Sequence, residues 1–400
     1  MRNRVIFCVI ALWLVIVSGA QTPEWHINRE RMTETFITLA KIESGSDNEG
    51  EIGRFLMERL RALGADTVEM DEAHKQIGGT GGNVIARFKG TTNAPPLLLN
   101  AHMDTVSPTP NIQIVREGDL IRTDGSTILG ADNKAGIAII LEVLQTLKER
   151  NLPHPPLEVV FTIREEKGLL GAKAFDPSKL RARHGLVVDG REIPEEIFIQ
   201  SPTHWRFEVV FTGRASHAGA EPEKGRNAIV MASKAIAQMT WGRIDPDTSA
   251  NVGVIEGGQA MNIVPDRVKL VGEFRSFDPD RVKALAEKWK AACEQVAQEM
   301  EGTAEVTLSK TFDAVRTSPD SPLAQSALKV MRQLGVDARL TRTGGGSDAN
   351  VFAGYGIDCL VFPTGAADIH STKENLILPN FYRCGEGVLR IVVEWAGHSK

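Results

Sequence analysis

The sequence predicts an α/β fold with a mostly parallel central sheet, into which a smaller α+β domain is inserted. Three observations support this prediction. Helical segments alternate with short apolar runs toward both ends of the chain, and such runs are typical of buried parallel strands. The middle of the chain follows a different order of elements. The chain has 400 residues, more than one hydrophobic core usually holds, so we expect two domains.

The first part of the chain, residues 21–202, alternates between predicted strands and helices. Apolar residues recur at helical spacing in its early segments, and Gly64 stands where a helix C-cap is expected. We expect helices at Glu30–Ile42, Glu49–Leu63 and Lys134–Arg150, strands at Asn83–Phe88, 95–101, 157–163 and 185–188, and a hairpin at Ile112–Thr123.

The segment 203–311 carries the order strand, helix, strand, strand, helix, strand, which is typical of ferredoxin-like domains. We place these elements at Trp205–Phe211, Asn227–Met239, Asn251–Ile255, Arg267–Phe274, Pro279–Met300 and Ala304–Ser309. In the last part, 312–400, the α/β pattern resumes with a helix at Pro322–Leu334 and a strand at 359–362. We therefore expect 203–311 to be an insert, called the lid below, in a domain built from both ends of the chain.

Residues 1–20 have the layout of a secretory signal peptide. Arg2 and Arg4 precede an apolar run, and Ser18-Gly19-Ala20 supplies the small residues of a cleavage site. An uncleaved anchor is the alternative, but the apolar run of about 13 residues is shorter than the roughly 20 that a membrane span needs. We expect cleavage after Ala20, an extracytoplasmic protein and no stable membrane association afterwards.

The bulk composition is that of a soluble globular protein and gives no sign of nucleic-acid binding. The net charge is −5 and the pI is about 6.0, without a basic block. Of the four cysteines, Cys8 would leave with the signal peptide, and Cys293, Cys359 and Cys384 remain. An odd number without paired spacing does not indicate a disulfide framework.

Metal-type side chains follow the predicted strands of the first domain. The residues after the four apolar runs are, in chain order, His102 and Asp104, Glu165 and Glu166, Asp189, and His370. Ligands of open α/β sheets bind beyond the carboxyl ends of the strands, so these side chains are expected to meet. Imidazole and carboxylate suit zinc and similar divalent ions. The sequence therefore predicts one metal centre.

Each of these residues also has a plainer interpretation when it is taken alone. His102 could be an ordinary histidine at a strand end, and Asp132 could be the N-cap of the helix that follows it. Glu165 and Glu166 could be solvated charges paired with Lys167. The functional alternative is that one of them ligates metal and the other acts as a general base on bound water. The occurrence of all these metal-type residues at strand ends favours the metal centre over the separate plainer interpretations.

The order of these residues resembles the M20 family of di-zinc metallopeptidases, close to its peptidase T-like branch. The matching stretches include His102-Met103-Asp104-Thr105-Val106, Gly130-Ala131-Asp132-Asn133-Lys134-Ala135-Gly136, Glu165-Glu166-Lys167-Gly168, Val188-Asp189-Gly190, Gly213–Gly219, Gly344–Asn350 and Ile369-His370-Ser371-Thr372. They cover nearly the whole chain after the signal segment. The resemblance implies a zinc-exopeptidase-like catalytic domain with an inserted lid and dimerisation domain.

The resemblance also implies a role for each matching residue of the metal centre. One metal would be held by His102, Asp132 and Asp189, and the other by Asp132, Glu166 and His370, so that Asp132 bridges them. It implies a cis peptide bond after Asp132, Asp104 as the residue that orients His102, and Glu165 as the general base. The metals expected are two zinc ions, with cobalt or manganese as alternatives.

Substrate contacts are implied in the lid and in a glycine-rich loop. The family dimerises through the lid, and His217 would correspond to a histidine that reaches the partner's active site and stabilises the oxyanion. Asn262 and Arg275 resemble substrate contacts, and Arg suits a substrate carboxylate; a surface charge is the alternative for Arg275. Gly345, Gly346 and Ser347 would let the backbone approach the substrate.

These observations lead us to expect a di-metal exopeptidase that hydrolyses an amide bond in small peptides, with an aminopeptidase or tripeptidase activity. Hydrolysis of N-acyl amino acids or a carboxypeptidase activity on the same centre is the alternative within hydrolases. A catalytically silent secreted peptide-binding module is the alternative in another class. The secretory signal departs from the peptidase T-like branch, whose proteins are typically cytoplasmic.

Overall fold

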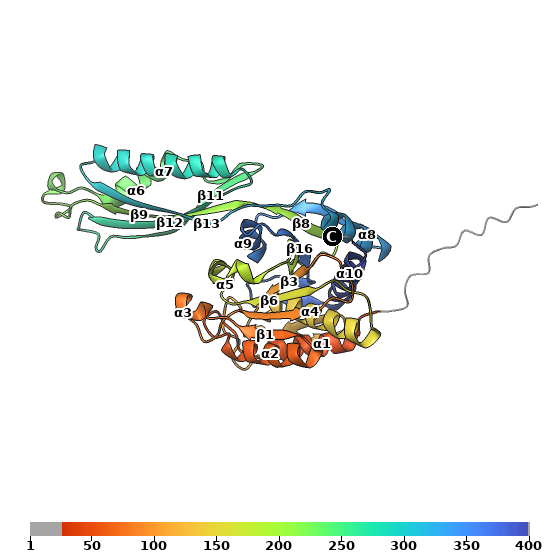
Figure 1. Ribbon diagram of the computed structural model, residues 1–400. Helices are drawn as coiled ribbons and strands as arrows, with labels where there is room; N and C mark the ends of the chain where they lie inside the picture. Colours follow the sequence, from red (N-terminus) through yellow and green to blue (C-terminus); the bar gives the residue numbers. More distant parts are fainter. Residues whose placement is uncertain (1–25, 399–400) are drawn as a thin grey trace, which may run out of the picture.

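The computed structural model describes residues 26–398, which form a larger body and an elongated lid that extends from it (Figure 1). The larger body contains a nine-stranded sheet, and the lid contains a five-stranded sheet. The predicted signal segment lies outside the described residues. Among residues 26–398, no helix combines the length and the apolar character needed to cross a bilayer.

The large sheet confirms the predicted mostly parallel core. Its order is β1-β2-β6-β3-β7-β16-β8-β14, with β15 beside β8. The four apolar runs that the sequence analysis singled out became the adjacent strands β6, β3, β7 and β16, and each neighbouring pair is parallel. The strands are β1 (Thr67–Met70), β2 (Val84–Phe88), β3 (Leu97–His102), β6 (Leu157–Thr162), β7 (His184–Gly190), β8 (Glu196–Ser201), β14 (Val315–Arg316), β15 (Arg339–Arg342) and β16 (Asp358–Pro363).

Both faces of this sheet are covered, which explains why its central strands are mostly apolar and why every residue of β3 and β6 is buried. Leu97 and Leu99 pack into the main core, while Leu98 between them packs into a second cluster on the opposite face. The main core is closed by α1 (Arg29–Ala40), α2 (Gly50–Leu63), α4 (Ala131–Arg150), α8 (Pro322–Gln333) and α10 (Leu378–Trp395). The second cluster includes residues of α9 (Asp348–Gly354). Two short helices, α3 (Ala73–Ile77) and α5 (Leu170–Ala174), complete this body.

A small four-stranded sheet places a loop next to the parallel strands. Its order is β17-β18-β5-β4, with β4 (Ile114–Glu117), β5 (Leu120–Thr123), β17 (Ala366–Ala367) and β18 (Asn375–Ile377). The strands β4 and β5 form the predicted hairpin. The loop between β17 and β18 carries His370, so the hairpin helps to fix one predicted metal ligand.

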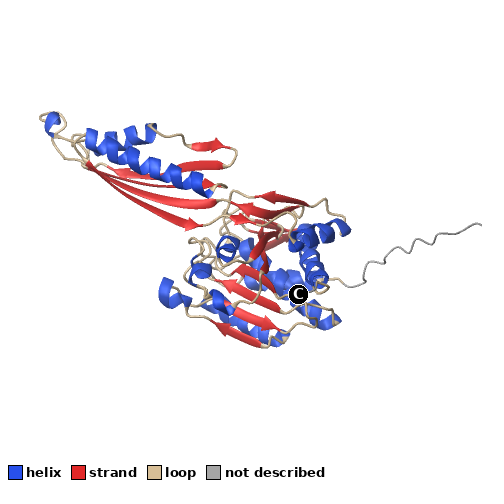
Figure 2. Ribbon diagram, turned by 45° about the horizontal axis from the view of Figure 1, so that its top comes forward, coloured by secondary structure: helices blue, strands red, loops and turns tan. Residues whose placement is uncertain are grey.

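The lid has the ferredoxin-like arrangement that its element order predicted. Its strands run in the order β10-β11-β12-β9-β13 and all neighbours are antiparallel. Both lid helices pack on one face of this sheet around the buried Trp289 and Phe207 (Figure 2). The elements are β9 (Thr203–Thr212), α6 (Ala228–Ala237), β10 (Gly242–Asp245), β11 (Thr248–Gly257), β12 (Arg267–Ser276), α7 (Pro279–Glu299) and β13 (Thr303–Phe312). The short β10 is an addition to the predicted order.

Candidate metal centre

The carboxyl ends of the parallel strands gather the predicted ligands at one edge of the sheet. β3 ends at His102, which pairs with Thr162 at the end of the neighbouring β6, just before Glu165. Asp189 is the penultimate residue of β7 on the other side of β3. Parallel pairing in register therefore brings segments that are far apart in the sequence to one place.

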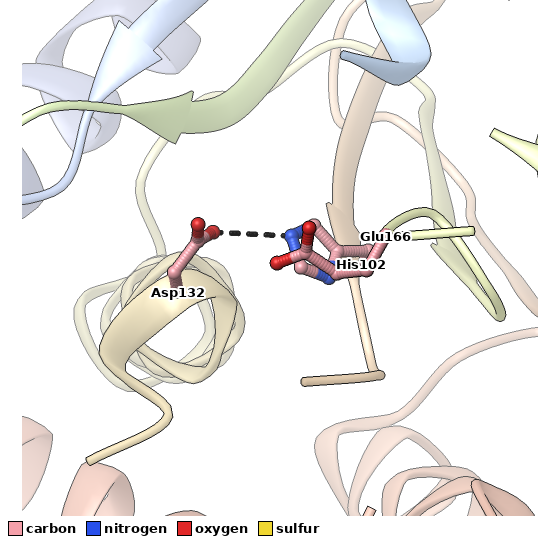
Figure 3. A group of neighbouring side chains, drawn as sticks. All are labelled: His102, Asp132 and Glu166. Carbon is pink, nitrogen blue, oxygen red and sulfur yellow. Dashed lines mark hydrogen bonds and ion pairs between the residues drawn. The ribbon is translucent and has the colours of Figure 1, made fainter. Parts of the chain in front are cut away.

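Five metal-type side chains meet at this edge with spacings that suit a metal centre. The distances are 3.1 Å from His102 Nε2 to Asp132 Oδ1, 3.5 Å from His102 Nε2 to Asp189 Oδ1, 3.2 Å from His370 Nε2 to Asp132 Oδ2 and 3.0 Å from His370 Nε2 to Glu166 Oε1. Donor atoms around a tetrahedral zinc ion lie roughly 3.3 Å apart, since each sits about 2.1 Å from the metal. Figure 3 shows three of these side chains converging.

Asp132 occupies the central position between the two halves of the cluster. One of its oxygens lies toward His102 and the other toward His370. A carboxylate with its two oxygens directed to different histidines is placed to bridge two metal ions. The donor set on each side, imidazole and carboxylate, fits divalent metals of the zinc type.

The backbone around Asp132 departs from the helix that follows it. The sequence analysis began this helix at Lys134, whereas α4 begins at Ala131 with non-helical backbone at Asp132 and Asn133. The peptide bond between these two residues is cis, as the resemblance implied. The preceding Gly130 has φ = 72°, and a Cβ there would approach Thr105 Cγ2 to 3.0 Å. Glycine therefore allows the turn that presents Asp132.

Asp104 is fully buried and connects two parts of the centre. Its backbone carbonyl accepts a hydrogen bond from His102 Nδ1 at 2.9 Å, and its carboxylate lies 3.4 Å from the same nitrogen. Its Oδ1 accepts a hydrogen bond from the backbone of Glu165 at 2.9 Å. Ser46 donates its hydroxyl to Oδ2 at 2.6 Å. Asp104 thus orients the histidine and also holds the turn that carries the paired glutamates.

Glu165 is buried beside the predicted ligands, with 8% of its surface exposed. Burial raises the pKa of its carboxyl well above the usual value; His102 opposes this effect, and the Asp189 and Asp348 carboxylates add to it. A carboxyl group whose affinity for protons is raised, next to a cavity, is suited to accept a proton from water.

The electrostatics of the cluster are dominated by closely packed carboxylates. Burial raises the pKa of Asp189 to about 7, and Asp132 and Asp348 add to this effect. For Asp132 burial works in the same direction, but its hydrogen bonds to His102 and His370 hold its pKa below the usual range. So many buried carboxylates need compensating positive charge, and bound cations would supply it.

A cavity of about 350 Å³ opens over the cluster. The glycine-rich loop forms one wall, with Gly345, Gly346 and Ser347 all lining the cavity. Ser347 is fixed because its backbone N–H donates to Asn350 Oδ1 at 3.0 Å at the start of α9. The other lining residues include an arginine and three apolar side chains: Arg191, Phe198, Val361 and Ile369.

The structure does not bring the predicted lid residues to this cavity. His217 and Asn262 are both exposed and lie on neighbouring lid loops, joined by a hydrogen bond from Ala218 N to Asn262 O at 2.9 Å. Neither residue is among those that line the cavity.

Arg275 is in the lid near the glycine-rich loop, and its guanidinium is already engaged. It donates to both carboxylate oxygens of Glu273, at 3.0 and 3.1 Å, and to the carbonyl of Gly344 at 3.1 Å. The same Glu273 carboxylate also contacts His204 at 2.9 Å. A substrate carboxylate would therefore have to compete with Glu273 for Arg275.

Three residues close to the centre had no role in the sequence analysis. Ser46 contacts Asp104, and Asp348 is a buried acceptor for Thr162 and Asn100 under the site. The carboxylate of Glu374 accepts hydrogen bonds from the backbone N–H groups of Leu129, Gly130 and Asp132. Asp348 belongs to a stretch that carried the family resemblance, which was a usable signal. Ser46 and Glu374 act through contacts to distant segments, which spacing along the chain cannot reveal.

Comparisons with known proteins show the family of the chain. The sequence model of the family described as Peptidase family M20/M25/M40 matches residues 98–394. YqjE, an uncharacterized protein of Bacillus subtilis (strain 168), is 38% identical over 370 residues, covering 92% of this chain and 100% of the relative.

Two solved structures share both sequence and fold with the chain. The aminopeptidase PepT from Bacillus cereus ATCC 10987 is 37% identical with a TM-score of 0.87, covering 92% of this chain and 99% of that one. A tripeptidase from Staphylococcus aureus subsp. aureus Mu50 is 36% identical with a TM-score of 0.90, covering 93% and 100%. This chain therefore belongs to peptidase family M20/M25/M40, in its peptidase T-like branch.

Proposed function

We propose that this protein is a di-metal exopeptidase that removes residues from short peptides, with an aminopeptidase or tripeptidase activity. The observation that carries the proposal is the position of Asp132, with one carboxylate oxygen toward His102 and the other toward His370. His102, Asp132 and Asp189 would hold one ion, and Asp132, Glu166 and His370 the other. Its relatives of similar length include an aminopeptidase and a tripeptidase, which favours this activity.

Two bound divalent ions would supply a water of lowered pKa and would polarise the scissile carbonyl. Glu165 would take a proton from the water as its oxygen adds to the scissile carbonyl carbon, and would pass that proton to the amine nitrogen as the C–N bond breaks. Its burial beside the cavity keeps the carboxyl out of bulk solvent. Asp104 holds the backbone N–H of Glu165 and so keeps the base in place. Zinc is the metal we propose, because histidine and carboxylate ligands at these spacings suit it.

The lid contributes through a homodimer. β10 pairs with β11 only along Thr248–Ala250, so within the described chain the rest of this strand has no neighbour on that side. Val254 and Ile255 on this open edge are 41% and 55% exposed. An open apolar edge is suited to pairing with the same strand of a second copy. In such a dimer we propose that His217 and Asn262 reach the partner's cavity, where His217 stabilises the oxyanion.

The remaining parts of the proposal concern substrate and location. Gly345, Gly346 and Ser347 would contact the peptide backbone, and Arg275 its carboxylate once Glu273 releases the guanidinium. The signal-like segment 1–20 supports an extracytoplasmic protein, which sets the proposal apart from the cytoplasmic location typical of its branch.

The test is hydrolysis of a small panel of free tripeptides and N-acetyl amino acids by the zinc-loaded protein. Identification of the end groups of the products shows which bond is cut. Release of the amino-terminal residue, abolished by a chelator, is expected. Cleavage of the acetyl group or of the carboxyl-terminal residue would replace the proposal with one of the other hydrolases, and no turnover of any substrate would favour a silent binding protein.

A further inference from the structure

A buried glutamate outside the set of proposed ligands binds the backbone that presents the bridging aspartate. Glu374 is 1% exposed. Its Oε2 accepts hydrogen bonds from the backbone N–H groups of Leu129 at 2.9 Å and Gly130 at 2.7 Å, and its Oε1 accepts one from the N–H of Asp132 at 2.9 Å. Both oxygens of one carboxylate are thus used to hold one short segment.

The hydrogen bonds of a regular helix do not satisfy the backbone N–H groups from Leu129 to Asp132. The first N–H groups of a helix have no partner within the helix. Here the backbone is also non-helical at Asp132, with φ = −84° and ψ = 103°. The carboxylate of Glu374 therefore fixes the direction in which the Asp132 side chain leaves the backbone. That direction decides whether the two oxygens of Asp132 can face two ions at once.

The same loop carries one of the metal ligands. His370 lies four residues before Glu374, between β17 and β18, and the loop is closed by a hydrogen bond from Glu374 N to Ser371 O at 3.0 Å. His370 Nε2 lies 3.2 Å from Asp132 Oδ2. One short loop thus contributes a ligand from one end and holds a second ligand from the other.

We propose that Glu374 is a positioning residue of the metal centre, which fixes the bridging carboxylate of Asp132 relative to His370. The inference rests on the metal centre of the proposed function, but not on the choice of substrate. Residues that orient metal ligands typically contribute about ten-fold to a hundred-fold to metal affinity. The effect should reach both ions, since Asp132 is shared.

The test is Glu374→Gln in the full-length protein. A glutamine has the same shape but only one acceptor oxygen, so its NH₂ group would face either the N–H of Asp132 or those of Leu129 and Gly130. Zinc affinity is measured by competition with a chromophoric chelator, and ligand geometry by the visible spectrum of the cobalt-substituted protein. We expect zinc to bind about ten to a hundred times more weakly and the cobalt spectrum to change.

Glu158→Gln is the matched control. Glu158 is also buried, 4% exposed, and its carboxylate also accepts only backbone hydrogen bonds, from Arg181 at 2.9 and 3.1 Å and Ala182 at 3.0 Å. It lies at the opposite end of β6 from the metal centre. We expect this variant to lose stability while its zinc affinity and cobalt spectrum stay unchanged.

Three results would overturn the inference. Unchanged zinc affinity and cobalt spectrum in folded Glu374→Gln would remove the role of Glu374, and an equal loss in both variants would show a general effect of instability. A wild-type protein that binds no metal would overturn the metal centre together with this inference. If Glu374→Gln does not fold, Glu374→Asp replaces it, because the shorter carboxylate cannot reach all three N–H groups; unchanged affinity there has the same meaning.

Discussion

Glu165 and Glu166 are neighbours in sequence with different proposed tasks, and exchanging each for glutamine should separate them. Glu165→Gln keeps the size of the side chain but removes the proton acceptor. A general base contributes about 10²- to 10⁴-fold to the rate, which corresponds to roughly 2.7–5.4 kcal/mol in activation free energy. We therefore expect kcat for a tripeptide to fall by this factor while the bound metal remains.

The same substitution should leave stability intact. Glu165 is buried near the Asp189 and Asp348 carboxylates, which raise its pKa in addition to burial. A neutral amide at this position relieves that repulsion, so the metal-free protein should unfold at the same or a higher urea concentration. A loss of activity with intact stability and intact metal would locate the effect in the chemical step.

The matched variant Glu166→Gln should behave in the opposite way. Glu166 lies 3.0 Å from His370 and within the group of donor atoms around Asp132, so its loss should release metal. Tripeptide turnover is followed by product chromatography, and metal content by elemental analysis of both variants. Turnover of Glu165→Gln within about three-fold of wild type, or metal loss equal to that of Glu166→Gln, would refute the assignment of the base.

Three further variants probe the rest of the proposal. His370→Ala should reduce bound zinc from two ions per chain to one, measured by elemental analysis. Ser46→Ala removes a hydroxyl that donates to the buried Asp104 carboxylate at 2.6 Å, and it should cost about 1.5–3 kcal/mol in the free energy of unfolding measured in urea. Val254→Lys combined with Ile255→Lys should convert the proposed dimer to a monomer in light scattering, and turnover should fall with it.

Two of these variants have a matched control, and each of the three has a result that would contradict it. Ser233→Ala removes a hydroxyl that donates to a backbone carbonyl on the exposed side of α6, so it should change stability by less than about 0.5 kcal/mol. Ala284→Lys adds charge to an exposed face of α7 and should leave the oligomer unchanged. A wild-type monomer would disprove the dimer, and two zinc ions in His370→Ala would remove that ligand. If Ser46→Ala lowers the free energy of unfolding by no more than Ser233→Ala does, the hydrogen bond from Ser46 to Asp104 does not stabilise the protein.

The sequence predicted the parts of the fold whose signal is local. The strand Leu97–His102 begins with three leucines because both of its faces are buried, and this pattern can be recognised from the sequence. The helix α10 was missed because Gly385 and Gly387 weaken the local helix signal. The structure shows a tertiary reason for both, since a Cβ on Gly385 would come within 2.9 Å of Met32 Sδ and one on Gly387 within 2.6 Å of Met331 Sδ. Short strands such as β1 and β10 also depend on their partners rather than on their own sequence.

The residues of the metal centre also differ in whether the sequence alone could reveal them. His102 and Asp189 were visible because each ends a recognisable strand with a metal-type side chain. Glu374 was not, because its partners are backbone groups more than two hundred residues away in the chain. Arg275 could be singled out as a cation, but its hydrogen bond to the Gly344 carbonyl joins segments 69 residues apart. A metal-type residue at a strand end can therefore be recognised from the sequence, whereas its long-range partners cannot.

The two places where the chain crosses between the lid and the larger body lie next to each other. Its first and last strands lie side by side, with His204 opposite Phe312, and just beyond them Ser201 of the large sheet pairs with Val315. The two crossings are therefore adjacent, and no strand of the large sheet is interrupted between them. A short peptide bridging them could replace the whole insert without changing the order of the other strands. The lid can therefore be exchanged for another domain, by evolution or by design, without moving the strands that carry the proposed metal ligands.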